Sequence, residues 1–127
     1  MQEVYKTYED RADFILVYLR EAHPTDGRRP ARHVKIKDPT SIEERDLVAG
    51  RCTETLKMTM PCVVDDMKDT VSKAYNAKPD RLFILGEDAK IVYRGDRGPR
   101  GFDIDGMEAA LKSQLAAVAS AKSGAAE

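Results

Sequence analysis

A short apolar run that ends in a polar turn is the strongest constraint on how this chain folds. Residues 14–19 read Phe-Ile-Leu-Val-Tyr-Leu, which is typical of a strand covered on both faces in a parallel sheet. The Pro-Thr-Asp-Gly turn at residues 24–27 stops this strand. Between the two lie Glu21 and His23, whose i, i+2 spacing places both side chains on one face of an extended segment.

Glu21 and His23 are therefore a candidate proton-transfer pair. Ligands of open α/β sheets bind at the carboxyl ends of the strands, where these two residues fall. A carboxylate beside an imidazole can orient the ring or raise its pKa. The spacing alone fits equally well a Glu and a His that simply solvate the edge of a sheet.

Strands alternate with helices along the rest of the chain, which favours an α/β fold with parallel strands and right-handed crossovers. A capping box, Ser41 with Glu44, predicts the start of the second helix, and Asp66 or Asp69 is expected to cap the third. The sequence predicts helices at 1–9, 41–56, up to 75 and from 103 or 105, with strands at 12–19, 61–65, 81–85 and 90–93. The last two strands form a hairpin.

Apolar side chains recur at helical spacing in the second and the last helix. In the second helix the predicted buried stripe is Val48, Cys52 and Leu56, which makes Cys52 a small core residue. In the last helix the stripe is Ile104, Met107, Leu111, Leu115 and Val118. We expect one domain over residues 1–118, followed by a flexible tail at 119–127.

The charges exclude several classes of partner. The chain of 127 residues carries 22 acidic and 21 basic side chains, so no overall field favours nucleic acid or a membrane surface. No apolar run is long enough to span a bilayer, and the N-terminus lacks the apolar core of a signal peptide, so we expect a cytoplasmic protein. The basic loop at 24–38 is either an anion-binding lid or a solvated run of charge.

No metal site is predicted. Cys52 and Cys62 lack the spacing of a metal motif. Asp65 and Asp66 are adjacent on a predicted strand, so their side chains point to opposite faces.

Three segments carry a resemblance to a known family. Residues 18–27 read Tyr-Leu-Arg-Glu-Ala-His-Pro-Thr-Asp-Gly, residues 61–67 read Pro-Cys-Val-Val-Asp-Asp-Met, and residues 91–102 read Ile-Val-Tyr-Arg-Gly-Asp-Arg-Gly-Pro-Arg-Gly-Phe. In this order they resemble motifs of the iodothyronine deiodinases and their bacterial relatives. The resemblance covers nearly the whole chain up to the final helix.

The resemblance implies a thioredoxin-like fold of the peroxiredoxin-like variety, with parallel strands, a C-terminal hairpin and a final helix. The family's first, central strand and its nucleophile segment are missing, so the domain is expected to be incomplete at its N-terminus. A central strand leaves two unpaired edges when it is absent. We therefore expect the chain alone to be marginally stable, to form homodimers or to borrow a strand.

The resemblance also implies a chemistry, a selenol- or thiol-dependent reductive dehalogenation of iodinated phenolic compounds. Glu21 and His23 would be the acid/base pair and Arg97 the substrate-binding residue. A thiol reductant would be the co-substrate, with no resident cofactor. Because neither Cys52 nor Cys62 matches the nucleophile position, this chain alone is expected to be inactive, as the nucleophile-free part of a selenoprotein-like enzyme.

Two other functions remain open on the sequence. The first is a nucleophile-free thioredoxin-like module that binds a partner, since no redox motif is present. The second is a peroxiredoxin-like thiol peroxidase that uses Cys62, although this cysteine falls on a predicted buried strand where thiols are usually inert.

Overall fold

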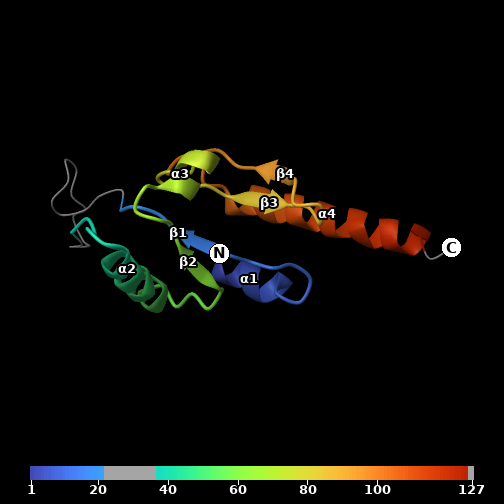
Figure 1. The fold of residues 1–127 in the computed structure, drawn as a ribbon. Helices are drawn as coiled ribbons and strands as arrows, with labels where there is room; N and C mark the ends of the chain where they lie inside the picture. Colours follow the sequence, from blue (N-terminus) through green and yellow to red (C-terminus); the bar gives the residue numbers. More distant parts are fainter. Residues whose placement is uncertain (22–36, 126–127) are drawn as a thin grey trace. The chain divides into compact units, whose positions relative to one another are not determined.

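A computed structural model describes residues 1–21 and 37–125 of the chain. The chain divides into two compact units, Met1–Pro79 and Asp80–Glu127. The elements follow one another as α1 (Gln2–Tyr8), β1 (Leu16–Tyr18), α2 (Ile42–Thr55), β2 (Cys62–Val64), α3 (Thr70–Tyr75), β3 (Phe83–Leu85), β4 (Ile91–Arg94) and α4 (Ile104–Ala125) (Figure 1). This order of helices and strands is the predicted one. Most of the predicted basic loop, residues 24–36, lies outside the described residues.

In the first unit β1 and β2 form a parallel pair, as the sequence predicts. Leu16 is opposite Cys62 and Tyr18 is opposite Val64. The ladder continues one residue beyond β2, because the Asp65 amide donates to the Tyr18 carbonyl at 2.9 Å. The two strands therefore end at the same edge, and the segments that follow them start from neighbouring points.

The predicted complete burial of both strands is wrong. Every residue of β1 is only half-buried, and Cys62 and Val63 of β2 are exposed. Among the described residues the sheet of this unit has two strands. A two-stranded sheet leaves much of its apolar surface accessible, so the apolar composition of these strands does not produce a covered core.

Helix α1 packs through the two residues that its spacing predicts. Val4 and Tyr8 lie i, i+4 apart and both are buried. The Gln2 side chain fixes the start of the helix to the segment before β2, since its Nε2 donates to Thr59 Oγ1 at 2.6 Å and its Oε1 accepts from Thr59 N at 2.9 Å.

The N-cap predicted at Ser41 is confirmed, and the predicted partner Glu44 bonds the residue before the N-cap. Ser41 Oγ accepts from the Glu44 amide at 3.2 Å. The Glu44 carboxylate reaches back to Thr40, where it accepts from the backbone amide at 2.8 Å and from the hydroxyl at 3.0 Å. The backbone hydrogen bond from Thr40, followed by that from its hydroxyl, lowers the pKa of Glu44.

The buried face of α2 differs from the predicted stripe. Leu56 is 65% exposed, whereas Arg45 and Ala49 are fully buried and Cys52 is half-buried. These three residues, at i, i+4 and i+7, form the inner face of the helix, which lies beside β2 (Figure 1). The stripe predicted from the apolar spacing is wrong here because Arg45, in the first turn, is buried through hydrogen bonds to oxygen atoms.

In the second unit the predicted hairpin is confirmed. β3 and β4 are antiparallel, with Phe83 opposite Arg94, and α4 runs alongside them (Figure 1). The buried side chains here are Ile84, Met107 and Leu111. Leu115 and Val118 are half-buried, and α4 continues through residues 119–125, which were expected to form a tail. The segment is rich in alanine, the strongest helix former.

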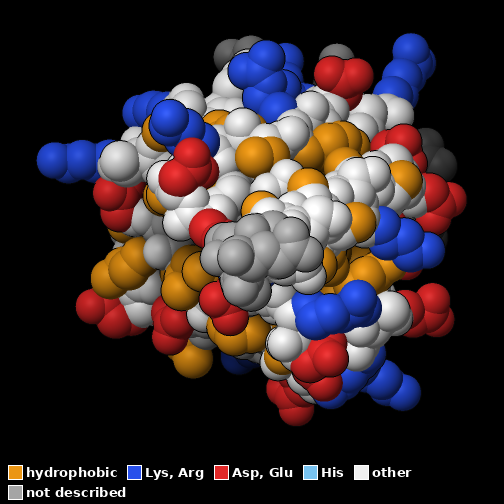
Figure 2. Space-filling model, turned by 90° about the vertical axis from the view of Figure 1, so that its right-hand side faces the viewer, with side chains coloured by type: hydrophobic (Ala, Val, Ile, Leu, Met, Phe, Trp, Pro, Cys, Tyr) orange, Lys and Arg blue, Asp and Glu red, His pale blue; other side chains and the backbone are white. Residues whose placement is uncertain are grey.

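The surface mixes both signs of charge with apolar side chains. Figure 2 shows this mixture on one face, in keeping with a net charge of −1. Within the described ranges, no helix combines the length and the apolar character needed to cross a membrane. The mixed α/β arrangement, with small parallel and antiparallel sheets and a C-terminal helix, is compatible with a thioredoxin-like fold. The single domain and the peroxiredoxin-like detail stay predictions.

Candidate functional site

Glu21 lies just past the carboxyl end of β1 and is half-buried. The hydroxyl of Tyr18, the last residue of β1, donates a hydrogen bond to Glu21 Oε1. Its sequence partner His23 lies outside the described residues. The sequence reasoning missed Tyr18, because residues i and i+3 of an ideal strand point to opposite faces and only a bend after the strand brings them together.

The Glu21 carboxylate also acts on the inner face of α2. Burial raises the pKa of the half-buried Cys52 thiol, and the negative charge of Glu21 raises it further. A thiol with a raised pKa forms less thiolate, so Cys52 is not activated as a nucleophile.

The thiol of Cys62 is not activated either. The residue is exposed, yet partial burial of its sulfur raises its pKa, and the negative charge of Asp46 and the neighbouring Cys52 add to this effect. A peroxidatic cysteine needs the opposite shift. The thiol-peroxidase hypothesis therefore loses its physical support.

Asp65 and Asp66 serve the start of α3. The buried Asp65 carboxylate accepts from the amides of Asp66 at 2.9 Å, Val71 at 3.0 Å and Ser72 at 2.9 Å. Asp66 accepts from the Thr70 amide at 3.0 Å and from its hydroxyl at 2.6 Å, and the hydroxyl bond is the main cause of its lowered pKa. Both carboxylates are thus used as helix caps.

Arg97 lies in the loop after β4, in the second unit, and its side chain is exposed. The loop is fixed at two points on either side of it. The Gly95 carbonyl accepts from Arg81 Nε at 2.6 Å, and the Gly98 amide donates to the Asp80 carbonyl at 2.9 Å. Arg97 itself closes a turn, because its carbonyl accepts from the Gly101 amide at 3.1 Å. The backbone that carries Arg97 is thus anchored on both sides of this residue.

Replacing Gly101 by alanine is expected to disrupt this turn. A Cβ atom at residue 101 would lie 2.6 Å from the Arg97 carbonyl oxygen and 2.7 Å from the Asp96 carbonyl carbon, and backbone atoms have no free end that can move aside. We expect the free energy of unfolding to fall by about 1–3 kcal/mol, as for other overpacked sites, measured by urea denaturation. Gly50→Ala is the control, because its added methyl group would have no atom within 4 Å apart from the adjacent backbone of its own helix, and alanine stabilises a helix. Equal effects of the two substitutions would contradict the clash.

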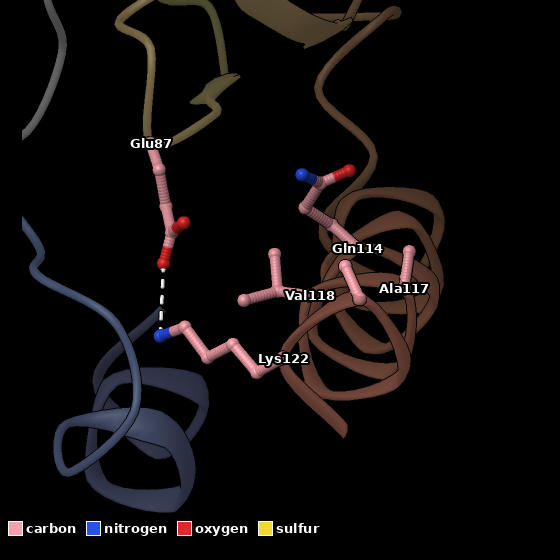
Figure 3. A pocket seen from close by; sticks show the side chains of 6 residues that line it. Glu87, Gln114, Ala117, Val118 and Lys122 are labelled. Atoms are coloured by element: carbon pink, nitrogen blue, oxygen red, sulfur yellow. Dashed lines mark ion pairs between the residues drawn. The ribbon is translucent and has the colours of Figure 1, made fainter. Parts of the chain in front are cut away.

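A shallow hollow of about 390 Å³ lies along α4. Its lining includes Gln114, Ala117 and Val118, and at its rim Lys122 Nζ pairs with Glu87 Oε1 at 3.1 Å (Figure 3). Both charged side chains of this pair are largely exposed, so the pair adds little stability. The hollow contains none of the residues that the sequence assigned to a site.

Comparison with known proteins supplies the family. The family model for iodothyronine deiodinase matches residues 1–114. Type I iodothyronine deiodinase of Xenopus laevis is 38% identical over 91 residues, which are 72% of this chain and 35% of that protein. Thyroxine 5-deiodinase of Sparus aurata is 36% identical over 108 residues, or 81% of this chain and 38% of that protein. Thyroxine 5-deiodinase of Gallus gallus is 36% identical over 102 residues, which are 76% of this chain and 37% of that protein.

These three relatives come from vertebrates. The chain spans somewhat more than a third of their length. The match over residues 1–114 includes all three segments that carried the sequence resemblance. This chain belongs to the iodothyronine deiodinase family.

Proposed function

We propose that the protein is a deiodinase-like oxidoreductase that removes iodine reductively from iodinated phenolic compounds. In this proposal Glu21 and His23 transfer protons and Arg97 binds the phenolate or another anionic group of the substrate. Family membership carries the proposal. It is supported by the position of Glu21 past the carboxyl end of β1, where the Tyr18 hydroxyl already holds its carboxylate.

The proposed reaction balances with a thiol reductant. A selenolate or thiolate attacks the iodine, the carbon–iodine bond breaks, and its electron pair stays on the ring carbon. That carbon takes a proton that Glu21 and His23 deliver, and the nucleophile is left as a selenenyl or sulfenyl iodide. Two equivalents of thiol then reduce this species to the starting selenolate or thiolate, forming a disulfide and releasing iodide and two protons, one of which restores the proton given up by Glu21 and His23. The raised pKa values of Cys52 and Cys62 argue against either as the nucleophile.

Substitution of Glu21 tests the proposed chemistry. The native protein, purified from its source cells and characterised by its intact mass, should release iodide from an iodinated phenol in the presence of dithiothreitol. Glu21→Gln removes the titratable carboxyl group but keeps the shape, so we expect kcat to fall by about 10²-fold or more. The exposed Glu43→Gln on α2 is the matched control and should leave kcat unchanged. Absence of iodide release, or full activity of Glu21→Gln, would refute the proposal.

A binding module is the second candidate function, and the absence of an activated thiol favours it. The iodide-release assay separates the two functions, because calorimetric titration with an iodinated phenol measures only the binding step that both share. A module would bind the phenol without releasing iodide. In either case Arg97→Ala should weaken binding, whereas Arg100→Ala, an exposed arginine of the same loop, should not. Equal affinities of the two variants would remove Arg97 from the binding site.

A further inference from the structure

We propose that Asp69 is a positioning residue of the candidate site, which couples the buried Arg45 to the segment that carries Glu21. This inference rests on the proposed function, because Asp69 would act through Glu21 and not on the substrate. The sequence suggested only a helix cap at this position. The structure instead shows a chain of four alternating charges, Arg45, Asp69, Arg20 and Asp38.

Arg45 is the fixed end of this chain. It lies in the first turn of α2, and its side chain is 1% exposed. Its Nη1 donates to the carbonyl oxygens of Asp65 at 3.2 Å and Asp66 at 2.7 Å, and to Asp69 Oδ1 at 3.2 Å. A guanidinium held on three oxygens in a buried setting has little freedom to reorient.

Asp69 is shaped for this contact and not for capping. It occupies the N-cap position of α3, yet its side chain makes no cap hydrogen bond, since the Asp65 carboxylate bonds the amides of Val71 and Ser72 instead. Its backbone is left-handed, with φ 59° and ψ 40°, a conformation that aspartate adopts more readily than most residues other than glycine. In this turn each carboxylate oxygen of Asp69 faces one arginine, Oδ1 facing Arg45 and Oδ2 facing Arg20.

Arg20 links Asp69 to the segment that carries Glu21. Its Nη1 lies 3.6 Å from Asp69 Oδ2, and its Nε donates to Asp38 Oδ2 at 3.1 Å. Glu21 is the next residue along the chain. The Arg20 side chain is 47% exposed, so solvent weakens each of its pairs, but Asp69 is only 16% exposed and is held from its other side by Arg45. The Arg20–Asp69 contact therefore restrains the backbone at the end of β1, and with it the carboxylate of Glu21.

Asp69→Asn separates this role from a structural one. Asparagine has the same shape and adopts the left-handed conformation readily, so the turn is kept while the charge is lost. Asp66→Asn is the matched control, because the Asp66 carboxylate belongs to the same turn but bonds Lys68 and Thr70 and no arginine. Both variants are compared with the native protein well below their melting temperatures.

Two measurements decide the proposal. In Asp69→Asn we expect amide hydrogen exchange in residues 16–21 to be on the order of 10-fold faster, with exchange in residues 83–94 unchanged. We also expect kcat for iodide release to fall at least about 10-fold, which is less than the whole contribution of proton transfer to the rate. KM should stay within about twofold of the value of the native protein. Asp66→Asn should change exchange only at the start of α3.

Unchanged exchange at residues 16–21 would overturn the inference, as would faster exchange with an unchanged kcat. A purely structural role predicts normal kcat whenever the variant is folded. If the native protein releases no iodide, the proposed function fails, while the exchange data still decide whether Asp69 restrains the end of β1.

Discussion

Arg45→Ala is expected to lower the free energy of unfolding by about 3 kcal/mol. The substitution removes three hydrogen bonds, to the carbonyls of Asp65 and Asp66 and to the Asp69 carboxylate, and empties a space that is closed to solvent. Breaking a buried charge pair by removing one partner costs about 3–5 kcal/mol. The lower end of this range applies, because Asp69 keeps Arg20 as a second partner.

Two comparisons identify the source of this loss, measured by urea denaturation followed by circular dichroism. Arg51→Ala, an exposed arginine on the same helix, should change the free energy of unfolding by no more than about 0.5 kcal/mol. Arg45→Met should cost less than Arg45→Ala, because methionine fills the space and removes the Nε atom, which has no hydrogen-bond partner among the described residues. A loss below about 1 kcal/mol for Arg45→Ala would show that its buried contacts are not net stabilising.

Asp65→Ala should have an effect of similar size on a different element. Asp65 is only 2% exposed. Its carboxylate accepts hydrogen bonds from the amides of Asp66, Val71 and Ser72. Each buried donor left without a partner costs about 1–3 kcal/mol, so we expect a loss of about 3 kcal/mol or more. Hydrogen exchange should accelerate first in α3, because the N-cap residue Asp69 makes no cap hydrogen bond and the bonds from Thr70 to Asp66 would be the remaining side-chain cap of this short helix.

Asp65→Asn refines this prediction. The amide oxygen can still accept from Asp66 and Val71, but the amide nitrogen then faces the Ser72 donor, so an intermediate loss is expected. Asp13→Ala is the control, since Asp13 is exposed. If Asp65→Ala unfolds at the same urea concentration as Asp13→Ala, the three amides have found other partners and the capping role is secondary.

Local signals in the sequence predicted much of the secondary structure. The capping box of Ser41 and Glu44, the i, i+4 pair of Val4 and Tyr8, and the hairpin around Gly86 all depend on neighbours within a few residues. Such patterns act through the same short distances in the sequence and in the fold. For the same reason the order of the elements was predicted correctly.

Burial was predicted less well, because it depends on what covers a segment. The apolar strand around Val63 and the end of α2 at Leu56 are exposed, while the arginine at residue 45 is buried. The spacing of apolar residues shows which face of a helix or strand can be buried. Whether that face is buried depends on the number of strands in the sheet and on the elements packed against it.

The sequence alone determined the family, through three ordered motifs, and it placed Glu21 at the end of a strand. Only the tertiary structure decided which charges meet around that strand end. Residues 20, 45 and 69 are far apart in the chain, and their side chains are brought together by the parallel pairing of β1 and β2 and by the turn that follows β2. Charge pairs of this kind form through space, so no local pattern in the sequence specifies them.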